Sequence, residues 1–109
     1  MLNAECCLML LSERKWYRLN ETNVSRVPLE SGVYELSGTG AIVLYIGWAE
    51  GQSLQDKLRS HIKDPHNPCI ARSAFFFRFE LSLRPEEKAA EVLGAYRAER
   101  YGVLPDCME

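Results

Sequence analysis

The densest hydrophobic pattern runs from residue 31 to residue 62, where it predicts a strand, a turn, a second strand, a loop and a helix. Side chains at positions 33–36 alternate between the two faces of the first strand. A glycine-rich stretch, residues 37–40, predicts a hairpin turn. Residues 41–46 are continuously apolar, so we expect a second strand that is buried on both faces and central in its sheet.

A helix is predicted after this hairpin, from Ser53 to about Lys63. Ser53 is a good N-cap because its hydroxyl can accept a hydrogen bond from an exposed amide of the first turn. Apolar residues recur at i, i+4 and i+8 and form a buried stripe: Leu54, Leu58 and Ile62. Lys57 and His61 lie one turn apart and flank this stripe. Pro65 ends the helix.

A third strand and a last helix follow a loop over residues 65–73. The strand covers residues 74–83, and the helix covers residues 85–101, with Gly102 as its breaker. The inward side of this helix is expected to comprise Ala89, Val92, Leu93, Tyr96 and Arg100. Residues 104–107 form a tail that is expected to fold back.

Residues 1–25 form an N-terminal extension, and residues 26–109 form the domain itself. Short apolar clusters at residues 6–11 and 16–19 fit a strand or a helix equally well, so we expect a lid or an extra edge element. The predicted fold is therefore α+β. It has a small three-stranded antiparallel sheet flanked by helices, in the order β-β-α-β-α.

Length and composition are those of one small globular domain. The chain has 109 residues, of which 47% are hydrophobic and 26% are charged. No apolar run approaches the ~20 residues that a membrane helix needs, and no export signal precedes the domain. We therefore expect a cytoplasmic protein without membrane contact, whose four cysteines are reduced thiols: Cys6, Cys7, Cys69 and Cys107.

The net charge of −2 argues against a protein that simply coats nucleic acid. The charge is unevenly distributed, however. Residues 56–78 carry five basic and two acidic side chains, a net charge of +3, and they also hold both histidines. This segment could meet phosphates, or its charges could simply be solvated helix positions.

Two short words in the hairpin carry a family resemblance. Gly32-Val33-Tyr34, followed after ten residues by Tyr45-Ile46-Gly47, resembles the paired motifs of the GIY-YIG nuclease superfamily. The resemblance covers about residues 27–107, and the β-β-α-β-α order supports it. The ending from Tyr101 to Cys107 is similar to that of small stand-alone members.

The resemblance implies hydrolysis of a nucleic-acid phosphodiester, DNA by analogy with the family, with one divalent metal, usually Mg²⁺. Tyr34 and Tyr45 match the two motif tyrosines, and together with His61 they would position the attacking water. Lys57 stands where the family has an arginine, and it would stabilise the charge on the phosphate. A lysine keeps that charge but lacks the planar fork of a guanidinium group.

The metal ligand is the main departure from the family pattern. The metal-binding glutamate of the family falls on Ala89, whose methyl group cannot hold magnesium. A shift of two residues makes Glu91 the metal ligand, and Glu86 or Glu87 in the first helical turn are further alternatives. Met108 occupies the place of an asparagine that several members carry.

Nucleic acid would be contacted by Arg59, Lys63 and Arg72. Trp48, in the predicted loop 47–52, could stack on a base or cap the core. The sequence thus leaves two functions open. One is a magnesium-dependent endonuclease. The other is a degenerate member of the fold that binds nucleic acid, a protein partner or a second copy of itself without cleaving anything.

Overall fold

The computed structural model describes residue 11 and residues 14–108. Its elements, in chain order, are β1 (Tyr17–Arg18), α2 (Glu21–Val24), β2 (Gly32–Ser37), η2 (Thr39–Ala41), β3 (Val43–Ala49), α3 (Leu54–His61), α4 (Pro68–Ser73), β4 (Phe76–Leu81), α5 (Pro85–Glu99) and η3 (Asp106–Met108). No helix in this part of the chain is long and apolar enough to cross a bilayer. The apolar cluster predicted for residues 6–11 lies outside the described residues, except for Leu11, which is buried.

The four strands form one antiparallel sheet in the order β1-β4-β2-β3. The α+β class is therefore confirmed, but the predicted count of three strands is wrong. The additional strand, β1, comes from the N-terminal extension and pairs Tyr17 with Phe77 and Arg18 with Phe76. β1 is at the edge of the sheet, which confirms the extra edge element expected from the N-terminal extension. A strand of two residues is too short to show an alternating pattern, so its pairing with β4 could not be predicted.

β3 lies at the edge of the sheet, so its predicted central position is wrong. The prediction failed because a continuously apolar strand indicates only that both of its faces are covered. Here helices cover both faces of the sheet, so an edge strand can also be apolar throughout. The outer edge of β3 is covered in turn by the C-terminal turn η3, where the Ile46 N–H donates to Met108 Sδ at 3.3 Å. β3 also continues through Ala49, so Trp48 belongs to the strand and not to a loop.

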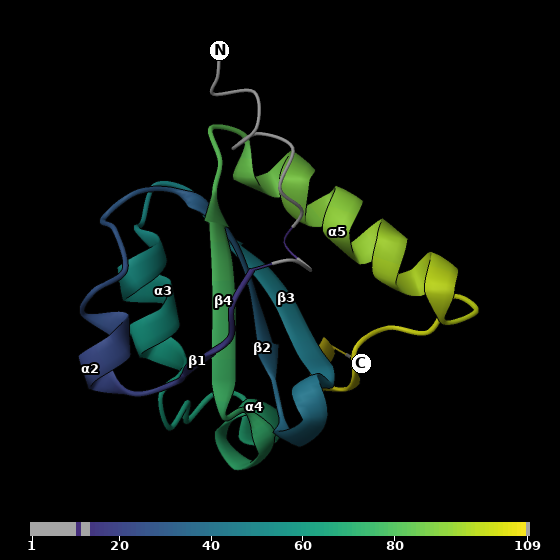
Figure 1. Ribbon diagram of the computed structural model, residues 1–109, viewed down its shortest axis with the longest axis horizontal. Helices are drawn as coiled ribbons and strands as arrows, with labels where there is room; N and C mark the ends of the chain where they lie inside the picture. The colour runs from purple at the N-terminus through teal and green to yellow at the C-terminus, as the bar shows by residue number, and fades with distance from the viewer. Residues whose placement is uncertain (1–10, 12–13, 109) are drawn as a thin grey trace.

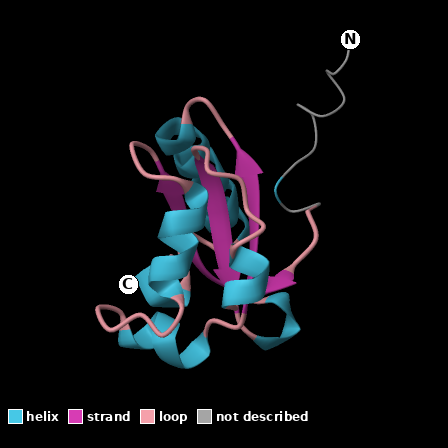
Figure 2. Cartoon of the chain, turned by 90° about the vertical axis from the view of Figure 1, so that its left-hand side faces the viewer, coloured by secondary structure: helices cyan, strands magenta, loops and turns pink. Residues whose placement is uncertain are grey.

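Helices α3 and α5 lie on opposite faces of the sheet (Figure 1). When the molecule is turned so that the α3 side faces the viewer, helices stand in front of the strands (Figure 2). We call the side that bears Tyr34 and Leu36 the tyrosine face, and the side that bears Val33 and Glu35 the α5 face. This alternation along β2 is the one that the sequence predicts.

Each face has its own hydrophobic core. The core of the tyrosine face includes Tyr34, Leu36, Leu54, Leu58, Ile70 and Phe77. The core of the α5 face includes Leu11, Val33, Val43, Ile46 and Ala89, with Val92, Leu93 and Tyr96 packed against it. The predicted inward side is thereby confirmed for the first long helix, and for Ala89, Val92, Leu93 and Tyr96 of α5. Arg100, which was also predicted to face inward, is exposed. Val24, from the N-terminal extension, is fully buried in the tyrosine-face core, so the extension shares that core.

The segment after α3 is more ordered than the sequence suggests. The predicted loop 65–73 contains α4, a six-residue helix. Asn67 caps it, because its Oδ1 accepts from the Ile70 N–H at 3.1 Å, and Pro68 occupies the first turn. A helix of this length buries too few apolar side chains for periodicity to reveal it.

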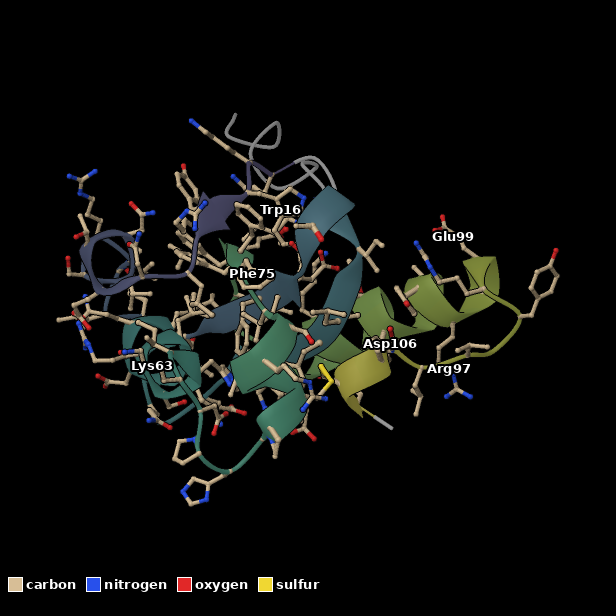
Figure 3. All side chains as sticks on the ribbon, turned by 90° about the horizontal axis from the view of Figure 1, so that it is seen from below. Trp16, Lys63, Phe75, Arg97, Glu99 and Asp106 are labelled. Carbon is tan, nitrogen blue, oxygen red and sulfur yellow. A yellow bond between two sulfur atoms is a disulfide. The ribbon has the colours of Figure 1, made fainter. Side chains whose placement is uncertain are left out.

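Cys69 and Cys107 form a disulfide that ties α4 to η3. Figure 3 shows this bond in yellow, next to Asp106. The expectation of reduced thiols is therefore wrong for these two residues. The predicted fold-back of the C-terminal tail is confirmed, and the disulfide and the contact with β3 hold it in place.

Candidate functional site

A hydrogen bond joins Tyr34 to His61 on the tyrosine face. Tyr34 lies in the middle of β2, and His61 is the last residue of α3, which packs over that strand through Leu54 and Leu58. The Tyr34 hydroxyl and His61 Nε2 are 2.7 Å apart. Both residues are buried, and only 1% of the surface of Tyr34 is accessible to solvent. The structure therefore brings these two predicted site residues together in the interior.

Asp64 extends this pair into a chain of three polar side chains. Its Oδ2 lies 3.1 Å from His61 Nδ1, and its Oδ1 accepts from the His66 N–H at 2.9 Å. An ionised Asp64 requires Nδ1 to donate, so His61 Nε2 is the acceptor and the Tyr34 hydroxyl donates to it. Sequence reasoning missed Asp64, although its position three residues after His61, just past the end of the helix, was a usable signal.

Burial sets the charge states of this chain. It lowers the pKa of His61 more than Asp64 raises that pKa, and the positive charge of Lys57 lowers it further. Burial alone would raise the pKa of Asp64, but hydrogen bonds from the His66 amide and from His61 hold that pKa below its usual value. Burial also raises the pKa of Tyr34 strongly. At neutral pH, Asp64 is therefore a carboxylate, His61 a neutral imidazole and Tyr34 a neutral phenol.

Tyr45 is the more accessible of the two motif tyrosines. It lies on β3, half-buried, with its ring centroid 6.2 Å from that of Tyr34 and 5.3 Å from that of His61. Burial raises its pKa, and the nearby charge of Asp64 adds to this effect. Because Tyr34 is enclosed, Tyr45 is the phenol that can meet a molecule from solvent.

Gly47 allows the two tyrosines to occupy this arrangement. Gly47 is the cross-strand partner of Tyr34. A Cβ atom at this position would lie 2.5 Å from the Tyr34 hydroxyl oxygen and 2.9 Å from Cε2 of Tyr45. The glycine of the second motif is thus required because the Tyr34 ring crosses directly over its backbone.

Lys57 lies one helical turn before His61 and is half-buried on α3. The i, i+4 spacing puts Lys57 on the same side of α3 as His61, and its positive charge contributes to the lowered pKa of His61. The structure therefore brings together four of the predicted site residues: Tyr34, Tyr45, Lys57 and His61.

Glu91, the predicted metal ligand, is not part of this group. It is exposed on α5, which packs on the α5 face, and the tyrosines point to the other side of the sheet. Ala89 points into the core of the α5 face, so a carboxylate there would also face away from the tyrosines. Met108 packs against the same core. The prediction placed Glu91 beside the tyrosines because one sequence cannot reveal which face a helix covers.

The predicted nucleic-acid contacts are dispersed. Trp48 is 40% exposed and pairs with Val33 across the strands, which puts its side chain on the α5 face. Arg59 is engaged by Glu21, whose Oε2 accepts from Nη2 at 2.7 Å and whose Oε1 accepts from Nε at 3.0 Å. Lys63 and Arg72 are exposed near α3 and α4. Lys63 lies on the side of the molecule opposite to Arg97 and Glu99 of α5 (Figure 3).

The residues on the tyrosine face do not fit a magnesium ion held by the protein. Mg²⁺ needs carboxylate oxygens at about 2.0–2.1 Å. Asp64 has both oxygens committed to His61 and His66. Among residue 11 and residues 14–108, no three His, Cys, Asp or Glu side chains form a group that could hold a metal.

Comparison with known protein families identifies the family of this chain. The model of a family described as a domain of unknown function (DUF7508) matches residues 9–100. The match covers most of the chain, so the chain belongs to this family. It begins within the N-terminal extension and includes β1 through α5. No curated protein matches the sequence.

Proposed function

We propose that this member of the DUF7508 family is a GIY-YIG-like module that binds nucleic-acid phosphates on its tyrosine face and does not cleave them. One observation carries the proposal. Asp64, the carboxylate that the structure places beside the two tyrosines, is committed to His61 and His66, while Glu91 lies on the other face. The tyrosine face therefore offers a hydroxyl and cations but no free carboxylate for a metal among the residues that the structure describes.

Phosphate binding is supported by cations on or next to α3 and α4, the helices that pack on the tyrosine face. Lys57 is half-buried near the phenols, and Lys63 and Arg72 are exposed on the neighbouring elements. Ammonium and guanidinium groups beside a phenol hydroxyl suit the oxygens of a phosphodiester backbone.

The binding experiment measures fluorescence anisotropy of labelled duplex and single-stranded oligonucleotides over a range of salt concentrations. We expect binding that weakens steeply with salt. The Lys57→Ala and Lys63→Ala variants should each reduce the slope of log K against log[salt] by about 0.9 on duplex DNA. Arg84→Ala is the matched control, because Arg84 is exposed at the start of α5, away from this face. Equal slopes in all three variants would refute the proposed surface.

A magnesium-dependent endonuclease is the second candidate, and the polar chain of Asp64, His61 and Tyr34 favours it. In that case His61 and Tyr34 orient Tyr45 and Lys57 toward a phosphate, and the metal ligand comes from the substrate or from a partner. The discriminating assay incubates plasmid and branched DNA with Mg²⁺ or Mn²⁺. Cleavage by the wild type that is lost in Tyr45→Phe would overturn the binding-module proposal.

A further inference from the structure

The disulfide between Cys69 and Cys107 belongs to the tyrosine face. Both cysteines pack in or against the core of that face, as Tyr45 does. Cys69 lies in α4 and Cys107 in η3, so the bond joins two short elements whose cysteines are 38 positions apart in the chain. A covalent bond therefore lies within the face to which we assign phosphate binding.

The position of α4 depends on its contacts with the rest of the domain. The helix has six residues, which is too short for it to be stable by itself. Asn67 caps its first turn, and Ile70 is buried in the core of the tyrosine face. The disulfide adds a covalent tie at the second residue of the helix. We therefore expect α4 to be held less firmly when this bond is open.

Arg72 lies on the same side of α4 as Cys69. The two residues are three positions apart, and residues at this spacing are neighbours on a helix surface. Arg72 is exposed, and none of the ion pairs formed by the described residues includes it. A charged side chain binds a ligand more tightly when its helix already holds it in place, because less freedom is lost on binding. The disulfide therefore bears directly on how well Arg72 can contact a phosphate.

Cys69 is the more accessible half of the bond. It is half-buried, whereas only 7% of the surface of Cys107 is accessible to solvent. A thiolate of a dithiol can attack Cys69 Sγ, which breaks the S–S bond and releases Cys107 as a thiolate that takes up a proton. The second thiol of the reductant then displaces Cys69 as a thiol and closes the reductant's own disulfide. Two electrons and two protons thus pass from the dithiol to the two cysteines.

We propose that the disulfide between Cys69 and Cys107 is a redox switch for phosphate binding on the tyrosine face, a regulation that rests on the function proposed above. In the oxidised protein the bond holds α4 so that Arg72 contacts a phosphate. Reduction by a dithiol releases α4 from η3, and this contact is lost. Lys57 and Lys63 lie outside α4, so their contacts persist in the reduced protein. Reduction therefore weakens binding by the equivalent of one phosphate contact.

The test measures binding of labelled duplex DNA by the full chain before and after reduction with dithiothreitol, and a thiol assay checks that the bond is open. The parent protein carries Cys6→Ser and Cys7→Ser, which leaves Cys69 and Cys107 as its cysteines. One phosphate contact contributes about 0.9 to the slope of log K against log[salt], or about eightfold in affinity at about 0.1 M salt. We expect reduction to lower the affinity about eightfold and the slope by about 0.9.

Arg72→Ala tests the switch without any reduction step. The oxidised variant should bind as weakly as the reduced parent, and reduction should weaken it no further. Lys63→Ala is the matched control, because it should still respond to reduction by the full amount. Circular dichroism under the same conditions checks that the reduced proteins stay folded.

Four results would overturn the switch. Oxidised Arg72→Ala could bind as the oxidised parent does, or the reduced parent could keep its affinity, and the function proposed for the tyrosine face would then stand. Loss of binding together with the circular dichroism signal would assign the effect to unfolding. An oxidised parent that shows no salt-dependent binding would refute the proposed function, and the switch with it.

Discussion

Replacing Gly47 by alanine should destabilise the fold because the new methyl group collides with the tyrosines, and not because of backbone strain. Gly47 does not have a positive φ, so the backbone itself accepts alanine. The new Cβ would lie 2.5 Å from the hydroxyl oxygen and 2.6 Å from Cζ of Tyr34. Overpacking in a core costs about 1–3 kcal/mol. If Tyr34 moves, its bond to His61 is also lost, at about 1 kcal/mol. We therefore expect a loss of about 2–4 kcal/mol.

The assay is urea unfolding followed by tryptophan fluorescence. With a slope of roughly 1–3 kcal/mol/M, the midpoint should fall by at least about 0.7 M. Gly94→Ala is the control of opposite sign. Gly94 lies inside α5, and no neighbouring atom comes within 4 Å of the place that a Cβ would take, so alanine should stabilise by about 0.5–1 kcal/mol. A Gly47→Ala midpoint within roughly 0.3 M of the wild type, about the error of the method, would refute the reasoning.

Three further changes have defined outcomes. Arg78→Met should cost about 3–5 kcal/mol because it leaves the Glu35 carboxylate buried and unpaired. Cys107→Ser should cost about 2–4 kcal/mol because it opens the disulfide to Cys69, and thermal unfolding checks both values. His61 has a lowered pKa in the folded state, so the unfolded state binds more protons below pH ~6.5 and stability falls as the pH falls through that value. Protonation of His61 contributes at most about 1.4 kcal/mol per pH unit to the slope of the free energy of unfolding against pH. This contribution should be absent in His61→Gln, as measured by urea unfolding between pH ~5 and ~8.

Each of these three outcomes has a contrary result. If Glu35→Gln combined with Arg78→Met is no more stable than Arg78→Met alone, the unpaired carboxylate is not the cause of the loss. An unfolding temperature of the wild type that is unchanged by dithiothreitol would show that the disulfide contributes nothing. A His61→Gln slope equal to that of the wild type over the same pH range would assign the pH dependence to another group.

The sequence predicted the elements whose local pattern matches their final environment. The hairpin joined by residues 37–40, the Ser53 cap and the inward side of α5 all follow from rules that act within a few residues. The Ser53 side chain does accept from the Asp56 N–H, at 3.1 Å. These features depend on the spacing of residues along the chain and not on which element packs where.

The features that could not be predicted depend on the arrangement of distant segments. β1 is short, and its pairing with β4 becomes visible only in three dimensions. Asp64 gains its role because α3 ends where His61 meets Tyr34. Glu91 failed as a neighbour of the tyrosines because α5 covers the other face. The pairing of Cys69 with Cys107 likewise depends on where the tail returns.

The tail that covers β3 also bears on how the protein behaves at high concentration. An apolar edge strand with accessible amides is a template for pairing with another molecule, and it can seed aggregation. β3 has such a sequence, and its Ile46 amide is bonded to the thioether of Met108, which is a weak acceptor. The disulfide holds η3 against this edge. Reducing conditions should therefore release η3 from β3 and shorten the time to visible aggregation. The turn η3 is thus expected to limit association between separate molecules as well as to cover its own sheet edge.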